Sequence, residues 1–359
     1  MKDLIVMAGG GTGGHLFPGI ALAEEFIRRD NRWTVVFVGT KGRLDSTLLP
    51  KWGFTLVTIP AAPLRVRGWT RQMRGMVALI RGFFTSIGVL RRLSPCMVIG
   101  LGGYASGPVL LAAWWLGVTR VIQEQNVHLG FTNRAAARFS HRVFLSWPEA
   151  RTSFPAGLLT GNPVRRSVMN GLGMCRRDDG FCIVVLGGSQ GAHAINRAVV
   201  DALPRFSEIG SGLRIVHQTG MSDYEWVRQA YREQDVPAEV HSFIDDMASV
   251  YRNAHLIVCR AGATTLSEIC VWGRAAVMIP YPFASDNHQL KNAETIVDAG
   301  AGTMILEPNL TGESLAREVI LLANHRASLA QMEQRASSLG RPDAAPAIVD
   351  ECYQVMGLN

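Results

Sequence analysis

The feature that most constrains the fold is a glycine-rich turn between an apolar run and a helical pattern. Residues 4–8 predict a buried parallel strand, and the next seven residues are Gly-Gly-Gly-Thr-Gly-Gly-His. From Leu16 to Phe26 apolar residues recur at helical spacing, and Pro18 suits a first helical turn. Glycine permits positive φ and close approach of a ligand, and a helix start offers N–H groups. We therefore predict a strand–turn–helix unit whose turn faces an anionic or polar ligand.

Three kinds of site are weighed for this turn. Gly9, Gly11 and Gly14 match the dinucleotide pattern G-x-G-x-x-G, but that motif also needs an acidic residue after the second strand, which here ends in Gly-Thr-Lys. A P-loop needs Lys and Ser or Thr after the glycines. The third is a loop facing a sugar or an acceptor, with His15 available for acid–base chemistry. The alternative, in which His15 only caps the backbone, stays open.

Composition limits the class of protein. The 359 residues suggest about two domains, and 48% apolar against 18% charged residues is typical of well-packed cores. The net charge of +7 favours phosphate-bearing partners or an anionic membrane surface. No helix-turn-helix, RRM or KH pattern accompanies this charge, so we expect no nucleic-acid partner. The six cysteines are scattered and no aspartate-rich loop is present, so we expect no disulfide, metal site or cofactor.

Strand and helix patterns alternate through both halves of the chain. Strands are predicted at residues 4–8, 33–38, 54–59, 96–101, 119–123 and 142–145, and then at 181–186, 213–218, 239–243, 255–259 and 275–279. Glycine turns follow the strand before residue 102 and the strand before residue 187. This alternation predicts an α/β fold of two doubly wound units with a ligand cleft between them. Residues 161–180 predict the linker.

The segment at residues 63–92 combines arginines with apolar and aromatic side chains. From about residue 71 it predicts a helix with more apolar residues than one core-facing stripe needs. Such a segment can lie in a membrane interface, or it can be an ordinary crossover helix with solvated arginines. The first residues show no signal-peptide pattern, and we expect no stretch to cross a bilayer because Arg81 interrupts the longest apolar run.

Two polar clusters in the second half predict ligand chemistry. Residues 261–268 predict a small-residue turn opening a helix, whose N–H groups could hold a diphosphate, with Glu268 able to accept ribose hydroxyls. Gln289 and Asn292 would share one helix face, and amide side chains suit sugar hydroxyls. The alternatives are a helix cap with a solvated glutamate, and an exposed polar helix face.

Seven motifs follow one another in order over nearly the whole chain. They are Gly-Gly-Thr-Gly-Gly-His (10–15), Gly-Gly-Tyr-Ala-Ser-Gly-Pro (102–108), Glu-Gln-Asn (124–126), Gly-Asn-Pro-Val-Arg (161–165), Gly-Gly-Ser-Gln-Gly-Ala (187–192), Phe-Ile-Asp-Asp-Met (243–247) and Gly-Ala-Thr-Thr-Leu-Ser-Glu (262–268). Together they resemble the MurG family of peptidoglycan N-acetylglucosaminyltransferases, which convert lipid I to lipid II. One glycine motif is weak evidence, whereas seven in order are specific.

The resemblance implies a GT-B glycosyltransferase with two Rossmann-like domains facing across a cleft. Residues 1–162 would bind the undecaprenyl-diphosphate-linked acceptor and an anionic inner membrane surface. Residues 163–340 would bind UDP-N-acetylglucosamine, and a C-terminal helix, 341–359, would pack back on the first domain. The implied protein is peripheral, at the cytoplasmic face of the inner membrane, and uses neither metal nor cofactor.

The resemblance also implies roles for individual residues. Ile244 would contact uracil through its backbone, Arg165 would lie close to the nucleotide, and Glu268 would hold the ribose. The other implied substrate-binding residues are Thr12, Gly13, Gly14, Asn126, Ser189, Ala263, Thr264, Thr265, Gln289 and Asn292. The implied reaction is direct displacement at the anomeric carbon with inversion to a β-1,4 link, and His15 is the candidate base.

The chain departs from the family pattern in a few places. His288 stands where glutamine is frequent, Gln123 stands where histidine is common, and residues 127–129 replace a glycine-containing step. These changes leave the nucleotide-binding motifs intact. The alternatives are a related GT-B transferase with another lipid acceptor, a nucleotide-sugar epimerase, and a non-catalytic UDP-sugar-binding envelope protein.

Overall fold

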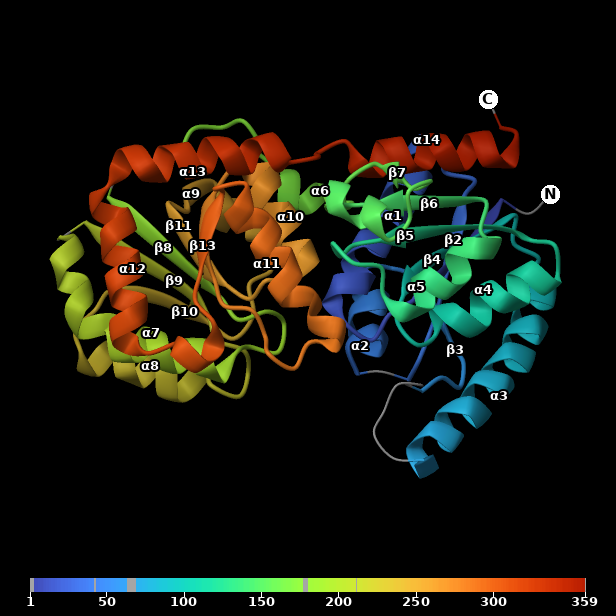
Figure 1. The fold of residues 1–359 in the computed structure, drawn as a ribbon, viewed down its shortest axis with the longest axis horizontal. Coiled ribbons are helices and arrows are strands. Elements are labelled where there is room, and N and C mark those ends of the chain that lie inside the picture. Colours follow the sequence, from blue (N-terminus) through green and yellow to red (C-terminus); the bar gives the residue numbers. More distant parts are fainter. Residues whose placement is uncertain (1–2, 42, 63–68, 177–179, 211, 359) are drawn as a thin grey trace. The chain divides into compact units, whose positions relative to one another are not determined.

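Parallel strands and helices alternate along the chain and divide into two units, each with its own sheet (Figure 1). The computed structural model describes residues 3–41, 43–62, 69–176, 180–210 and 212–358. Met1–Arg165 and Pro342–Asn359 form the N-terminal unit, and Arg166–Arg341 forms the C-terminal unit.

The N-terminal unit contains a seven-stranded parallel sheet. Its order is β3(Thr55–Thr58), β2(Thr34–Gly39), β1(Leu4–Gly9), β4(Met97–Gly102), β5(Thr119–Glu124), β6(Arg142–Leu145) and β7(Leu158–Leu159). The sequence predicted all of these except β7, whose two residues are too few to form a pattern. β1 and β4 are buried at every position, which explains why they are continuous apolar runs.

Helices cover this sheet, and one of them comes from the far end of the chain. They are α1(Gly13–Arg29), α2(Arg43–Lys51), α3(Trp69–Leu93), α4(Ser106–Trp115), α5(Phe131–Ala136) and α14(Ala344–Met356). Ile348 and Val349 of α14 are fully buried in the same core as Phe26 of α1. The indole Nε1 of Trp33 donates to the Tyr353 hydroxyl at 2.7 Å. The last eighteen residues therefore complete the core of the first unit.

The C-terminal unit contains a six-stranded parallel sheet. Its order is β10(Ala238–His241), β9(Leu213–Gln218), β8(Phe181–Leu186), β11(Leu256–Cys259), β12(Ala275–Met278) and β13(Gly302–Met304). Its helices are α6(Arg166–Met169), α7(His193–Phe206), α8(Tyr224–Glu233), α9(Met247–Asn253), α10(Ala263–Trp272), α11(His288–Asp298), α12(Gly312–Asn324) and α13(Arg326–Leu339). The sequence analysis missed β13, a three-residue strand at the sheet edge.

Each sheet has one point where the chain order reverses. β1 is flanked by β2 on one side and β4 on the other, and β8 is flanked in the same way by β9 and β11. The loops that follow two such strands leave in opposite directions, and open α/β sheets bind ligands at this point. The glycine turns after β1, β4 and β8 and the small-residue turn after β11 lie at these two reversal points.

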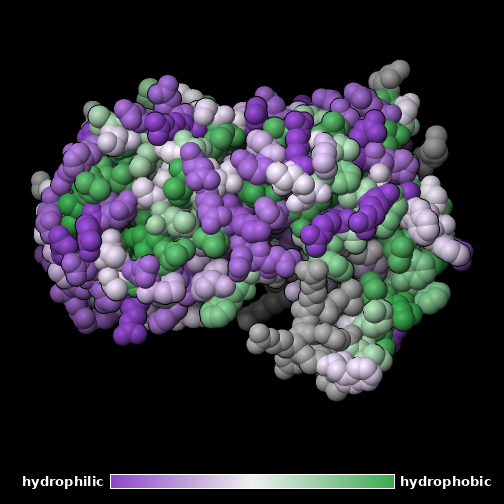
Figure 2. Space-filling view, in the orientation of Figure 1, coloured by the Kyte–Doolittle hydropathy of each residue, from purple (hydrophilic) through white to green (hydrophobic). Residues whose placement is uncertain are grey.

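α3 differs from the sequence-based expectation. By length and composition alone, Met73–Leu93 could cross a membrane, so the expectation that no stretch could do so is wrong; only 22% of its most apolar part is buried. Val89 and Leu90 pack into the core of the N-terminal unit. Large apolar side chains on the rest of the helix are exposed, namely Trp69, Met73, Met76, Val77, Ile80 and Phe84. Figure 2 shows hydrophobic colour gathered where α3 lies. Two arginines of the segment at residues 63–92, Arg65 and Arg67, lie outside the described residues.

Candidate active site

His15 lies between the two glycine turns of the N-terminal unit. The turn after β1 leads into α1, where Gly13 and Gly14 are the first two helical residues. The Thr12 hydroxyl and His15 Nδ1 are 3.0 Å apart. Gly102, at the end of β4, has φ +92°, and a Cβ there would lie 3.0 Å from His15 Nε2. Glycine at 102 therefore lets the imidazole lie against the second turn.

A buried polar cluster supports the loop that carries Asn126. Glu124 at the end of β5 accepts hydrogen bonds from the Asn126 backbone at 3.0 Å, the Gly130 backbone at 3.0 Å and the Asn133 amide at 2.9 Å. Burial raises the pKa of Glu124, and these donors oppose that effect. Gln123 donates to Asn162 at 3.0 Å. The sequence analysis noted Glu124 only as part of a motif. The buried hydrogen bond from Gln123 to Asn162 was not predicted either.

Arg165 belongs to the N-terminal unit. Its side chain is buried, and its guanidinium carbon lies 4.0 Å from the centre of the Phe17 ring and 5.4 Å from that of Trp52. Phe17 follows His15 on α1 by two residues, so Arg165 packs beside the glycine turn of this unit. Stacking on two aromatic rings fixes the guanidinium, as cation–π contacts do.

Gln218 connects two of the predicted donor-site loops of the C-terminal unit. It is the last residue of β9, and its Nε2 donates to the Gly188 carbonyl at 3.0 Å. Its Oε1 accepts from the backbone N–H of Ile244 at 2.9 Å. Half-buried Ser189 follows Gly188 directly, and Ile244 is 7% exposed. The sequence analysis did not single out Gln218, although its place at the carboxyl end of a strand was a usable signal.

α10 begins at the second reversal point. Gly262 precedes it without a side chain that could cap the first N–H groups, and the first turn holds buried Ala263 and Thr264 and half-buried Thr265. Glu268 lies one turn further on and is 5% exposed. Its Oε2 accepts from the Tyr251 hydroxyl at 2.8 Å, a partner that the sequence analysis missed. Tyr251 therefore orients the carboxylate that was predicted to hold a ribose.

Gln289 and Asn292 share α11 but differ in exposure. Asn292 is fully buried and its amide donates to the Ala261 carbonyl at 3.2 Å, so it supports the turn before α10. Half-buried Gln289 accepts from the Tyr281 backbone at 2.9 Å. Just before α11, Asp286 and Asn287 have φ of +50° and +53°. Such strain in non-glycine residues is frequent at ligand-binding segments.

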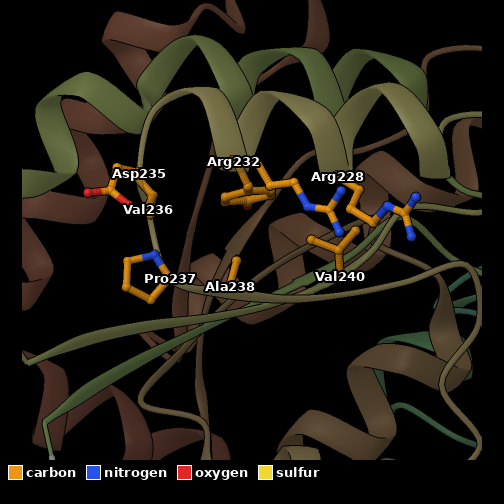
Figure 3. Close-up of a pocket in the computed structure, with 8 residues that line it drawn as sticks. Arg228, Arg232, Asp235, Val236, Pro237, Ala238 and Val240 are labelled. Atoms are coloured by element: carbon orange, nitrogen blue, oxygen red, sulfur yellow. The ribbon is translucent and has the colours of Figure 1, made fainter.

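One cavity lies away from these residues. A cavity of about 470 Å³ opens between α8 and β10, with Arg228 and Arg232 above Ala238 and Val240, while Asp235 points away (Figure 3). None of the predicted site residues lines it. Within the described residues, no cluster of three or more His, Cys, Asp or Glu side chains that could hold a metal ion is found.

These groups can perform distinct chemical tasks. A histidine oriented by a hydroxyl can take a proton from an alcohol. An uncapped helix start beside a glycine loop can hold phosphate groups, and an oriented carboxylate can accept two hydroxyls of a ribose. The N-terminal unit thus contains a candidate base, and the C-terminal unit contains a candidate site for a nucleotide.

Comparison with known proteins also divides the chain into two domains. Residues 5–145 match the glycosyltransferase family 28 N-terminal domain, and residues 182–348 match the family's C-terminal domain. A relative from Myxococcus xanthus is 46% identical over 355 residues, covering 98% of this chain and 93% of the relative. A relative from Geobacter sulfurreducens is 47% identical over 353 residues, covering 97% of each chain. Both are named UDP-N-acetylglucosamine–N-acetylmuramyl-(pentapeptide) pyrophosphoryl-undecaprenol N-acetylglucosamine transferase.

Solved structures give the same answer. MurG from Acinetobacter baumannii is 31% identical, with a TM-score of 0.77 over 98% of this chain and 99% of that one. A UDP-N-acetylglucosamine 2-epimerase from Neisseria meningitidis reaches a TM-score of 0.65 over 98% of this chain and all of that one, but at 12% identity it shows the fold alone. The two sheets and the two matched domains define a GT-B glycosyltransferase. Within that class, the chain belongs to the MurG family.

Proposed function

We propose that this protein transfers N-acetylglucosamine from UDP-N-acetylglucosamine to the 4-hydroxyl of N-acetylmuramyl-pentapeptide on undecaprenyl diphosphate. The observation that carries the proposal is the 46–47% identity, over nearly the full length, to relatives named for this transfer. The N-terminal unit binds the lipid-linked acceptor and the C-terminal unit binds the donor. We assign three functional divisions, which are residues 1–162, 163–340 and 341–359.

His15 is the base in this proposal. Its Nδ1 lies 3.0 Å from the Thr12 hydroxyl, a contact that orients the imidazole. The acceptor oxygen attacks the anomeric carbon, its proton passes to the imidazole, and the bond between that carbon and the diphosphate oxygen breaks with inversion. Electrostatic stabilisation of the leaving diphosphate comes from the first turn of α10. Gly13, Gly14 and Asn126 line the substrate on the same unit.

The donor is held in parts. We assign the diphosphate to Ser189 and residues 263–265, and the ribose to Glu268, which Tyr251 orients. Ile244 contacts the uracil through its backbone, and Arg165 lies close to the nucleotide. We assign the sugar to Gln289 directly. Asn292 acts on the sugar through the turn at Ala261, because its own side chain is fully buried.

We further propose that α3 binds an anionic membrane surface, so that the protein is peripheral on the cytoplasmic face of the inner membrane. The exposed apolar side chains of α3 are accompanied by exposed Arg74, Arg81, Arg91 and Arg92. An apolar stripe with basic residues suits a helix that lies in a membrane interface. The acceptor of the proposed reaction also carries a lipid tail. No nucleic-acid partner is proposed.

The deciding experiment measures transfer of labelled sugar from UDP-N-acetylglucosamine to a lipid I analogue. Wild type is compared with His15→Ala, and UDP affinity is measured for both. We expect His15→Ala to lose about 100-fold or more in kcat while UDP affinity stays unchanged, since general-base catalysis contributes roughly 10²–10⁴-fold. A wild-type protein that binds the donor but makes no lipid product would contradict the acceptor assignment. A His15→Ala variant with near-normal kcat would contradict only the base.

A further inference from the structure

The side chain of Gln218 forms hydrogen bonds to both the glycine loop after β8 and the loop carrying Ile244. Its amide uses both ends: Nε2 donates to the Gly188 carbonyl at 3.0 Å, and Oε1 accepts from the Ile244 N–H at 2.9 Å. The side chain is 5% exposed. Both bonds are therefore shielded from water, where a lost partner is costly.

The backbone next to Gln218 is closely packed against the glycine loop. A Cβ at Gly191 would lie 2.1 Å from the Thr219 carbonyl oxygen, and one at Gly220 would lie 2.5 Å from the Gln190 carbonyl oxygen. The Thr219 N–H donates to the His241 carbonyl at 2.9 Å, and the Asn196 amide donates to the Thr219 carbonyl at 2.9 Å. The end of β9 is therefore held by hydrogen bonds and close packing on the side where Gln218 contacts the two loops.

We propose that Gln218 is a positioning residue for the donor: it sets the distance between Ser189 and Ile244, and so between the diphosphate and base contacts. This inference rests on the proposed function, which assigns those two contacts. Gln218 does not touch the reacting atoms. It acts through Gly188 and Ile244, so its loss weakens binding of the nucleotide and leaves the acceptor contacts of the N-terminal unit unchanged.

The test uses UDP alone as the probe, with the full-length protein, and titration calorimetry as the readout. Gln218→Met keeps the shape and removes both hydrogen bonds, and we expect about a tenfold or greater increase in the Kd for UDP. The KM for the lipid acceptor analogue should not change.

His255→Ala is the matched control. His255 is also buried, and its Nδ1 accepts a backbone hydrogen bond from Cys182 at 3.1 Å, but at the opposite, amino-terminal edge of the same sheet. It should lower the melting temperature without altering UDP affinity.

The pH dependence of UDP affinity in Gln218→Glu is a readout that a purely structural role of Gln218 would not change. The carboxylate of this variant can accept from Ile244, but it repels the Gly188 carbonyl until it is protonated, when it donates again. Burial raises the pKa of such a carboxyl group, so the UDP affinity of Gln218→Glu relative to wild type should recover as the pH falls from 8 to 6.

Each outcome decides the proposal. Weaker binding by Gln218→Met beside an unchanged His255→Ala supports it, and a folded Gln218→Met with wild-type affinity overturns it. If Gln218→Met does not fold, a pH-independent affinity ratio for Gln218→Glu overturns it and a recovering ratio supports it. A wild-type protein that binds no UDP contradicts the proposed function itself, and with it this role.

Discussion

At the scale of single residues, the contacts that can be tested most directly are those in which a side chain packs closely against backbone. The imidazole of His15 lies against a glycine in the left-handed region, and Gln218 spans two loops with one amide. Neither contact is local in sequence. Each can be tested with a change of a few atoms.

Gly102→Ala tests the contact with His15. The added Cβ would lie 3.0 Å from the imidazole and must displace it, so we expect kcat for transfer to fall by about 10- to 100-fold with UDP affinity unchanged. Gly117→Ala is the control, since Gly117 also has positive φ but a Cβ there meets nothing within 4 Å. Equal kcat values for the two variants would show that only backbone strain matters.

His217 predicts an acid sensitivity of the C-terminal unit. Burial lowers the pKa of His217 to about 3, and both ring nitrogens are hydrogen-bonded, to Tyr231 and to Asn196 at 3.0 Å each. In the unfolded chain the imidazole takes a proton near its ordinary pKa of about 6.5, so the unfolded state binds more protons. The stabilisation is complete above pH 6.5 and is lost progressively as the pH falls toward 3.

Denaturant unfolding between pH 6.5 and 5 measures this effect. We expect the free energy of unfolding to fall by up to about 1.4 kcal/mol per pH unit from this group. His217→Gln should flatten the slope, whatever it does to the stability at pH 7. A slope that survives in His217→Gln would assign the sensitivity to other groups, of which His255, with a pKa lowered by burial to about 4, is the first candidate.

At the scale of elements, α3 is the helix whose sequence agrees least with a purely internal role. One side packs against α4 and joins the core of the N-terminal unit, and the exposed side carries Ile80 at 50% and Phe84 at 66% exposure. We expect Ile80→Glu combined with Phe84→Glu to reduce sedimentation with anionic liposomes at low salt several-fold, because each change removes an inserted apolar group and adds repulsion.

The control for α3 is Leu321→Glu, a 50% exposed position on α12 of the other unit. It also replaces an exposed apolar residue with glutamate, here a single one on a different helix, and should leave sedimentation unchanged. If wild type does not sediment with anionic liposomes at all, the membrane proposal for α3 is wrong.

At the scale of the whole molecule, the chain crosses between its units twice, near residues 165 and 341. The final helix of the chain, α14, therefore stabilises the N-terminal unit. Arg29 of α1 pairs with Asp350 of α14 and donates to the Pro346 carbonyl at 2.9 Å. Ile348 is fully buried beneath these contacts.

Ile348→Ala should destabilise the N-terminal unit by about 2–4 kcal/mol, as truncation of a buried aliphatic side chain does. Hydrogen exchange should rise in β1 and α1, while β8 and α7 keep their protection. Leu321→Ala, half-exposed on α12, should change neither unit by more than about 1 kcal/mol. Faster exchange confined to β8 would contradict the assignment of α14 to the first unit.

The sequence by itself determined the two α/β units, since buried parallel strands are continuous apolar runs and their glycine turns precede helices. It also indicated that His15, Ser189 and residues 262–268 follow strand ends, where open α/β sheets carry glycine and polar residues. Two short edge strands, β7 and β13, carried too few residues to form a pattern. Arg81 led to the expectation that residues 76–90 could not cross a bilayer, but one charge does not offset the apolar residues of a 21-residue helix by length and composition.

Only the tertiary structure decided what each polar residue does. Asn292 and Gln289 share a helix and a residue class, yet one is fully buried on the Ala261 carbonyl and the other is half-exposed. Gln218 and Tyr251 gain their roles from partners distant in sequence. A strand end fixes which edge of the sheet a side chain occupies. Whether it points at a ligand or at a neighbouring loop depends on packing between elements, which no local pattern encodes.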